Sequence, residues 1–369
     1  MSFSAADYQF MSRALQLAKK GIYHTAPNPN VGCVLVKDNK IVGEGWHQKF
    51  GEAHAEVNAL KQAGQDAQGA TAYVTLEPCC HHGKTPPCTE ALIKAKVKRV
   101  VAAMIDPHVK VAGKGLKQLE AAGILVEQGL LEEQAKALNL GFIKRMQKRL
   151  PYVRCKLAMS LDGRTAMASG ESKWITSAAA REDVQRLRAK SSAILTGVGT
   201  VLADNPSMTV RLQDVDTRPL RVVVDTNLSM PTDAKMLKQA GRTVLMTCSA
   251  DEAITQALTE AGADIHIMPY CNTSVDLTSV LQQLSDMEIN DVLLETGATL
   301  SGAMLQAGLI DEIIIYMAPV LMGNDARGLF ALPGLEAMQD KIELEITEQR
   351  VIGKDIRITA KVSSSQLII

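Results

Sequence analysis

The stretch TLEPCCHHGKTPPC, residues 75–88, places three cysteines and two histidines within fourteen positions. A disulfide, a structural zinc knuckle or a catalytic metal site would each fit this composition. The whole chain has seven cysteines in 369 residues and no segment that resembles a signal peptide, which argues against a disulfide framework. The stretch is therefore predicted to bind a metal, and the segments that supply the ligands must fold to one point.

A second motif, His54-Ala55-Glu56, stands at the start of a predicted helix, one strand upstream of Pro78-Cys79. His-x-Glu followed by Pro-Cys is the signature of zinc deaminases. One imidazole and two thiolates hold zinc with its fourth position open to water, whose pKa falls to about 7. Glu56, which is not a ligand, would carry a proton from water to a ring nitrogen and then to the leaving ammonia.

The second thiolate is less regular, because the usual Pro-Cys-x-x-Cys is replaced by Cys79 and Cys88 with eight residues between them. Cys80 adjoins Cys79, and adjacent ligands at one tetrahedral ion are unusual. A loop that ends in Pro86-Pro87 can return Cys88 to the metal from the first turn of a helix, which favours a thiolate. The alternative is a closed zinc knuckle of Cys79, Cys88 and two histidines, in which Glu56 would have no role.

The first half of the chain alternates helices and strands. A helix capped by Asp7 is predicted to end at Gly21, and residues 31–46 form two strands around an Asp-Asn turn. A hairpin followed by repeated αβ units predicts a largely parallel sheet layered with helices. The predicted helices lie at 54–64, 89–95 and 114–122, and the predicted strands at 70–77, 97–105 and 124–127.

A chain of 369 residues exceeds one comfortable domain, and we place a boundary at Leu150-Pro151, after an amphipathic segment over 130–148. The second half begins with two strands around Asp162-Gly163 and a helix over 177–190 that Ser177 can cap. The pattern predicts a second α/β domain, so that the domains are 1–149 and 150–369. Its strands are predicted at 192–196, 220–225, 243–247, 264–268, 291–295 and 312–317, followed by a closing antiparallel hairpin.

Charge and hydropathy exclude several classes of protein. Forty basic residues balance forty acidic ones, and no basic run exceeds KAKVKR at 94–99, so a nucleic-acid partner is not expected. The sequence contains no stretch of eighteen apolar residues, the length that a membrane span needs, so no membrane partner is expected. Cysteines without a disulfide framework favour the reducing cytoplasm.

The motifs of both halves resemble a known family. The segments are PNPNVGC (27–33), GEAHAEVNAL (51–60), VTLEPCCHHGKTPPC (74–88), KLAMSLDGRTA (156–166), SKWITS (172–177), GVGTVLADNPSMTVR (197–211) and ETGATLSGAML (295–305). They resemble the bifunctional riboflavin-biosynthesis family, in which a pyrimidine deaminase is fused to a reductase. The resemblance implies a cytidine-deaminase-like three-layer α/β/α domain followed by a dihydrofolate-reductase-like α/β domain. A homo-oligomer is expected.

The resemblance also implies the substrate and the cofactors. The first domain would deaminate 2,5-diamino-6-ribosylamino-4(3H)-pyrimidinone 5′-phosphate with zinc, and the second would reduce the ribosyl group to ribityl with NADPH. Matched by motif, His54, Cys79 and Cys88 are zinc ligands and Glu56 is the proton donor. The family usually has serine where this chain has Cys80, which supports Cys79 as the ligand. The residues expected to line the deaminase pocket are Asn28, His47, His81, Lys84 and Asp106.

In the second domain the residues alone are less specific. GVGTVL (197–202) lacks the third glycine of the dinucleotide fingerprint, whereas ETGATLSG (295–302) leads from a strand into a helix whose amides suit a pyrophosphate. Ordinary glycine turns are the alternative for both. By resemblance, NADPH would contact Ala158, Trp174, Thr200, Asp204, Gly297, Ala298, Thr299, Leu300, Ser301, Gly302 and Ala303, and substrate would contact Ser172, Arg188, Met208, Arg211 and Glu295. Lys156 and Asp204 are the candidates for polarising the ribose, and Arg188 and Arg211 for binding phosphate as forks. For each arginine, a solvated charge on a helix or strand is the alternative.

Two other functions fit part of the sequence. His-Ala-Glu and Pro-Cys also occur in tRNA and cytosine deaminases, so a nucleic-acid or nucleoside deaminase with an accessory domain is the main rival. RNA binding that strengthens steeply at low salt would favour it. A zinc-stabilised binding protein without chemistry is the third hypothesis, and in that case Glu56→Ala would leave function intact.

Overall fold

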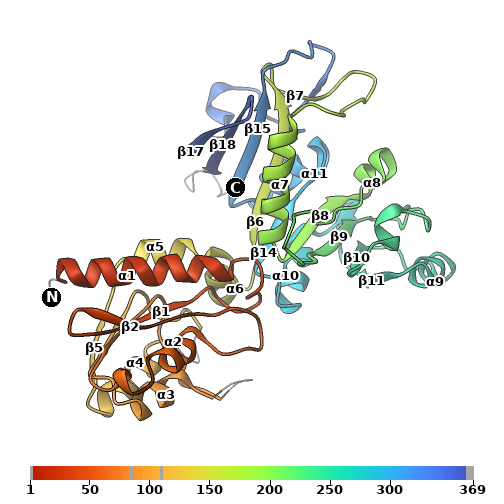
Figure 1. Ribbon diagram of the computed structural model, residues 1–369. Helices are drawn as coiled ribbons and strands as arrows, with labels where there is room; N and C mark the ends of the chain where they lie inside the picture. Colours follow the sequence, from red (N-terminus) through yellow and green to blue (C-terminus); the bar gives the residue numbers. More distant parts are fainter. Residues whose placement is uncertain (1–2, 83–85, 109–110, 363–369) are drawn as a thin grey trace. The chain divides into compact units, whose positions relative to one another are not determined.

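The computed structural model describes residues 3–82, 86–108 and 111–362, and the chain divides into two compact units, Met1–Leu150 and Pro151–Ile369 (Figure 1). The division falls between Leu150 and Pro151, one residue after the end of the first domain range, 1–149, given from the sequence. Each unit is built around one main sheet with helices packed on it. Within the described ranges, no helix has the length and apolar character that a membrane span requires.

The first unit has a five-stranded sheet in the order β2-β1-β3-β4-β5. β1 (Gly32–Lys37) runs antiparallel to both β2 (Lys40–Trp46) and β3 (Thr71–Val74). β3, β4 (Arg99–Ala102) and β5 (Leu125–Gln128) are parallel. Asp38 and Asn39 join β1 to β2 with positive φ at both positions, as a two-residue type I′ hairpin requires. The predicted hairpin followed by αβ units is confirmed.

Helices cover both faces of this sheet, because neighbouring residues of each strand point to opposite sides. Cys33 and Leu35 of β1 face α2 (Ala55–Ala63), α3 (Cys88–Lys94) and α4 (Lys114–Ala121) in one buried cluster. Val34 and Val36 face α1 (Ala5–Ala18), α5 (Glu132–Ala137) and α6 (Leu140–Lys148) in the other. The unit therefore has the three-layer α/β/α architecture.

Two details of the first unit differ from the prediction. Ser4, not Asp7, caps α1: the Asp7 amide donates to Ser4 Oγ, and the Asp7 carboxylate accepts from the Ser4 amide at 2.8 Å, which is a capping box. The segment over 130–148 forms two helices instead of one. The chain turns at Asn139, whose side chain hydrogen-bonds the backbone of Asn30 instead of continuing the helix.

The second unit has a nine-stranded sheet in the order β11-β10-β9-β8-β14-β6-β15-β18-β17. The strands from β11 to β15 are parallel, and the last two are antiparallel. Their bounds are β6 (Tyr152–Ser160), β8 (Ala193–Gly197), β9 (Leu220–Val224), β10 (Thr243–Thr247), β11 (Ala263–Ile267), β14 (Asp291–Leu294), β15 (Glu312–Ala318), β17 (Leu344–Ile352) and β18 (Asp355–Val362). The main helices are α7 (Ala178–Lys190), α8 (Val198–Asp204), α9 (Glu252–Glu260), α10 (Leu277–Asp286) and α11 (Ala298–Gln306).

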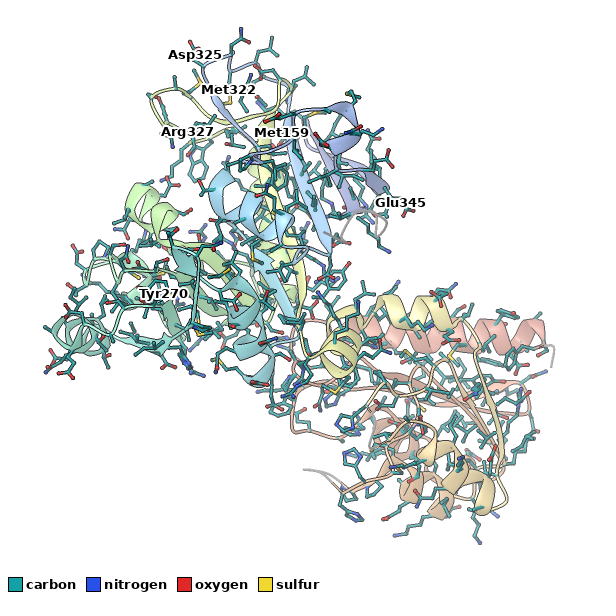
Figure 2. The ribbon with its side chains drawn as sticks, turned by 180° about the vertical axis from the view of Figure 1, so that it is seen from behind. Met159, Tyr270, Met322, Asp325, Arg327 and Glu345 are labelled. Atoms are coloured by element: carbon teal, nitrogen blue, oxygen red, sulfur yellow. The ribbon has the colours of Figure 1, made fainter. Side chains whose placement is uncertain are left out.

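The strands on either side of Asp162-Gly163 do not pair with each other as a hairpin, which corrects the prediction. β7 (Arg164–Ala166) pairs instead with β16 (Arg327–Gly328), while β6 stays in the main sheet. The reason is the Asp162 carboxylate, which accepts hydrogen bonds from the amides of Met322 and Gly323 at 2.8–3.1 Å. Met322 and Arg327 are labelled in Figure 2, as is Met159, the residue before the end of β6.

Candidate functional sites

Three side chains from different elements of the first unit meet in one cluster. His54 is the N-cap of α2, Cys88 is the first residue of α3, and Cys79 lies in the segment after β3. His54 Nδ1 lies 3.5 Å from Cys79 Sγ and 3.3 Å from Cys88 Sγ, and the three ligand atoms are all within 4.8 Å of one another. A nitrogen and a sulfur bound to one tetrahedral zinc would lie about 3.6 Å apart. The donor set and its spacing therefore fit zinc.

The cluster also resolves which cysteine belongs to it. The contact with Cys88, and then the neighbouring His54, lower the pKa of Cys79 to about 4. The Cys88 amide donates to Cys79 Sγ at 3.3 Å. Cys80 is not part of the cluster, and burial raises the pKa of its thiol. No second group of three such side chains occurs in the part of the chain that the structure describes.

Glu56 lies in the first turn of α2 and is only 3% exposed. Its carboxyl contacts the thiol of Cys88 but is not one of the three clustered ligands. Burial, and then the charge of Cys79, raise the pKa of Glu56 to about 7. A carboxyl with a pKa near neutrality can both accept and return a proton.

Two of the predicted pocket residues lie next to the cluster. Asn28 Nδ2 is 3.1 Å from His47 Nε2, and the rings of His47 and His54 meet edge to face with centroids 5.2 Å apart. His47 Nδ1 is 3.2 Å from the carbonyl oxygen of Ala53, which fixes the ring. Burial lowers the pKa of His47, so the neutral ring is favoured beside the metal ligands.

Asp106, another predicted pocket residue, lies in the segment after β4. Its side chain is buried, and burial raises its pKa to about 6, opposed by the hydrogen bond that the His108 amide donates at 2.8 Å. The Asp106 amide donates to Glu77 Oε2 at 3.1 Å, which connects Asp106 to the segment that carries Cys79. His81 is exposed, and its ring stacks on His108 with centroids 6.5 Å apart. Lys84 lies outside the described residues.

Sequence reasoning did not find Asn139. Its side chain accepts from the Asn30 amide at 2.7 Å and donates to the Asn30 carbonyl at 3.0 Å, so it holds the loop that carries Asn28. Asn139 is only 4% exposed. The only signal in the sequence was an asparagine in the middle of an amphipathic segment, which disfavours a continuous helix.

In the second unit, Glu295 follows β14 and lies between two cations. Arg188 Nε and Nη2 donate to its carboxylate at 2.6 and 3.0 Å, and Lys156 Nζ lies at 3.5 Å. Burial would raise the pKa of Glu295, but Arg188 and then Lys156 outweigh it and lower the pKa to about 2. Glu295 is therefore ionised at neutral pH.

The same contacts change the role expected for Arg188. Its remaining terminal nitrogen, Nη1, donates to the carbonyl of Thr209 at 3.0 Å. The fork is thus occupied by Glu295 and Thr209, and it is not open to a phosphate as the sequence predicted. Arg211 is exposed, and its amide donates to Gln185 Oε1 at 2.9 Å.

The carboxyl ends of β8 and β14 lie side by side, next to the middle of β6, where the strand order of the parallel sheet switches direction. Ligands bind at such switch points in open α/β sheets. Gly297 precedes α11 here, and a Cβ added to it would meet no atom within 4 Å. Thr196 Oγ1, at the end of β8, is buried without a hydrogen-bond partner. An open helix start and an unpartnered hydroxyl fit a dinucleotide phosphate.

Several predicted reductase residues are not available for contact. Ser301 is fully buried, and a Cβ on Gly302 would lie 1.9 Å from the Ala331 carbonyl oxygen, so both pack against protein. Met208 is a buried member of a core cluster. Asp204 is ion-paired with Lys173 at 2.9 Å but is partly exposed, so it can still contact a ligand. The other predicted residues are at least partly exposed: Ala158, Ser172, Trp174, Thr200, Ala298, Thr299, Leu300 and Ala303.

Comparisons with known proteins identify both domains. Residues 4–104 match the cytidine and deoxycytidylate deaminase zinc-binding region, and residues 151–358 match the RibD C-terminal domain. The riboflavin biosynthesis protein RibD of Escherichia coli is 50% identical over 362 residues, which cover 95% of this chain and 98% of that protein.

Solved structures show the same fold over nearly the full length. RibD of Acinetobacter baumannii, form 1, has a TM-score of 0.91 at 48% identity, and the match covers 97% of this chain and 99% of that one. A diaminohydroxyphosphoribosylaminopyrimidine deaminase/5-amino-6-(5-phosphoribosylamino)uracil reductase from Thermotoga maritima has a TM-score of 0.86 at 33% identity, with 97% and 99% covered.

Fold and site together define a two-domain enzyme, with a zinc-binding deaminase domain followed by a reductase domain. The cofactors of this class are zinc and NADPH. The chain belongs to the RibD family of riboflavin biosynthesis proteins.

Proposed function

We propose that the chain carries out two consecutive steps on one phosphorylated pyrimidine, a deamination in the first unit and a reduction in the second. The observation that carries the proposal is the cluster of His54, Cys79 and Cys88 with the buried, non-ligand carboxyl of Glu56 beside it. The substrates follow from the name of the Thermotoga maritima relative, a diaminohydroxyphosphoribosylaminopyrimidine deaminase and 5-amino-6-(5-phosphoribosylamino)uracil reductase.

In the deamination, His54, Cys79 and Cys88 hold zinc, which when bound supplies a Lewis acid that lowers the pKa of water towards about 7. Glu56 takes a proton from the attacking water and delivers it to the ring nitrogen, and a second transfer goes to the amine, which leaves as ammonia. Asn28 and His47 orient the ring, and Asp106, His81 and Lys84 bind the remainder of the nucleotide.

In the reduction, NADPH, when bound, would supply a hydride to C1′ of the substrate, whose ribosylamine opens to an imine. The imine nitrogen would take a proton from water, so the product would carry a ribityl chain. Lys156, held at 3.5 Å from the Glu295 carboxylate, polarises the ribosyl group, and Asp204 assists it. Glu295 and Arg211 face the substrate, and Gly297 with the first turn of α11 binds the cofactor phosphate.

The experiment uses both predicted substrates with the purified protein. The diaminopyrimidine nucleotide and NADPH together should yield ammonia and a loss of nicotinamide absorbance. After zinc is removed with a chelator, this mixture should yield neither, whereas the aminouracil nucleotide should still consume NADPH. NADPH consumption from the diaminopyrimidine nucleotide without ammonia release would contradict the proposed order.

We also propose that the chain acts in the cytoplasm as a homo-oligomer. The support for oligomerisation is β17, an edge strand of the large sheet that exposes Leu344, Ile346 and Val351 at 42%, 63% and 76%. Glu345 of the same strand is labelled in Figure 2. Exposed apolar edge strands are a liability unless they are covered. Sedimentation of the wild type and of Ile346→Lys tests this, because the variant should shift the protein to the monomer.

A further inference from the structure

One buried carboxylate of the first unit has no part in either proposed reaction. Glu77 lies two residues before Cys79 and is 3% exposed. A buried carboxylate is costly unless its oxygens accept hydrogen bonds or pair with cations. Among residues 3–82, 86–108 and 111–362, no cation forms an ion pair with Glu77. Hydrogen bonds must therefore offset the free-energy cost of burying its carboxylate.

Four backbone amides donate to Glu77. Oε2 accepts from Asp106 at 3.1 Å and from Gly113 at 2.8 Å. Oε1 accepts from Gly115 at 2.9 Å and from Leu116 at 3.4 Å. One carboxylate thus ties a segment that consists of the described residues 106–108 and 111–113 to the strand that leads to Cys79, with one hydrogen bond at each end of the segment. It also caps the first turn of α4.

Close packing keeps this arrangement in place. A Cβ on Gly115 would lie 2.2 Å from the carbonyl oxygen of Pro78 and 3.1 Å from Glu77 Oε1. Only glycine therefore lets α4 approach the Pro78-Cys79 backbone closely enough for its amides to reach the carboxylate. On the other side, the Glu77 amide donates to the Met104 carbonyl at 2.9 Å, which joins the end of β3 to the end of β4.

The segment that Glu77 ties down carries Asp106 and His108. Asp106 is 8% exposed, and its amide is bonded to Glu77, two residues before Cys79. The amide of His108 donates to the Asp106 carboxylate, and the ring of His108 contacts the ring of His81. If the two ends of this segment were released, both side chains would lose their fixed positions while His54, Cys79 and Cys88 kept theirs.

We propose that Glu77 is a positioning residue for deamination, whose carboxylate holds Asp106 and Gly113 in place so that Asp106 and His108 face the nucleotide. This rests on the proposed function, in which Asp106 binds substrate. A carboxylate is required because it accepts at every lone pair, whereas the isosteric amide of Gln would point an NH₂ group at the donating amides.

The test compares Glu77→Gln with Glu120→Gln, a matched change on the exposed face of α4. For Glu77→Gln, KM for the diaminopyrimidine nucleotide should rise at least about tenfold, the factor that corresponds to one hydrogen bond to a charged group. Its kcat should stay within about twofold, with zinc still bound, because Glu56 and the ligands do not move. Reduction of the aminouracil nucleotide in the same chain should be unchanged. Glu120→Gln should match the wild type in every respect.

Amide hydrogen exchange gives a readout that does not depend on activity. In Glu77→Gln the amides of Asp106, Gly113, Gly115 and Leu116 should exchange faster, while those of β4 should not. Unchanged KM with unchanged exchange would overturn the proposal. Loss of zinc from a folded Glu77→Gln would also overturn it, because Glu77 would then support the metal ligands instead of the substrate segment.

Gly115→Ala tests the same anchor from the helix side, and it decides the question if Glu77→Gln does not fold. Its added Cβ must push α4 away from Pro78, so KM should rise with zinc retained; an unaltered KM would overturn the proposal. If the wild type released no ammonia, the proposed deamination would fail. The exchange of the four amides would then still show whether Glu77 holds the segment.

Discussion

Removing the guanidinium of Arg188 should destabilise the second unit, because Glu295 would remain buried with only Lys156 beside it. The size of the effect follows from the pKa of Glu295, which is about 2 in the folded protein and about 4.3 in an unfolded chain. A difference of about 2.3 units corresponds to about 3 kcal/mol of stability at neutral pH. Arg188→Met should lose most of this amount.

The sign of the pH dependence is fixed by the direction of the shift. Because the folded pKa of Glu295 is lowered, its contribution is present above about pH 4 and is lost as the pH falls towards 2. In Arg188→Met the cost of burying the ionised Glu295 carboxylate is no longer offset. The variant should therefore lose less stability than the wild type when the pH falls.

Urea unfolding in a Trp46→Phe background measures the second unit alone, because Trp174 is then the single tryptophan of the chain. The double variant Arg188→Met/Glu295→Gln removes the uncompensated charge and should be more stable than Arg188→Met by more than about 1 kcal/mol. Equal stability of the single and double variants would refute the reasoning, since the cost would then come from lost packing of the arginine chain.

Three further outcomes are expected. Cys79→Ser and Cys88→Ser should each lose zinc, measured by metal analysis, whereas Cys80→Ser should keep one zinc per chain; zinc loss from Cys80→Ser would show that the ligand assignment is wrong. Gly297→Ala should raise KM for NADPH without lowering Tm, since the added Cβ fills open space at the start of α11; an unchanged KM would remove Gly297 from the cofactor site. Burial would raise the pKa of Asp7, but hydrogen bonds from Arg99 and Tyr73 hold this pKa well below its usual value. The ionised Asp7 therefore stabilises the fold above about pH 4, and this contribution is lost on acidification. Asp7→Asn should therefore be less stable than the wild type at pH 7, and the difference should shrink in acid unfolding curves; a constant difference would exclude Asp7 as the titrating group.

Much of the fold could be predicted from local patterns in the sequence. The Asp38-Asn39 turn, the helix that ends at Gly64 and the cap at Ser177 all depend on residues within a few positions of one another, and all are confirmed. The zinc cluster could also be predicted from the sequence, because His54, Cys79 and Cys88 each stand at the end of a predictable element.

Contacts between distant segments could not be predicted in the same way. Arg188 pairs with Glu295 across 107 residues, and nothing near either residue indicates that the guanidinium is already occupied. The pairing of β7 with β16 depends on Asp162 reaching the amides of Met322 and Gly323, some 160 positions away. Ser301 and Gly302 lie in a motif that suggests cofactor contact, yet the backbone at Ala331 covers them.

The central claim is that one chain holds two separable sites, and Glu56→Gln tests it most directly. This change keeps the shape of a buried side chain and leaves His54, Cys79 and Cys88 in place. Ammonia release from the diaminopyrimidine nucleotide should fall by at least about a hundredfold, since proton transfer by a positioned side chain contributes about that much or more. NADPH-dependent reduction of the aminouracil nucleotide by the same preparation should be unchanged, whereas loss of both activities in a folded, zinc-bound variant would contradict the account.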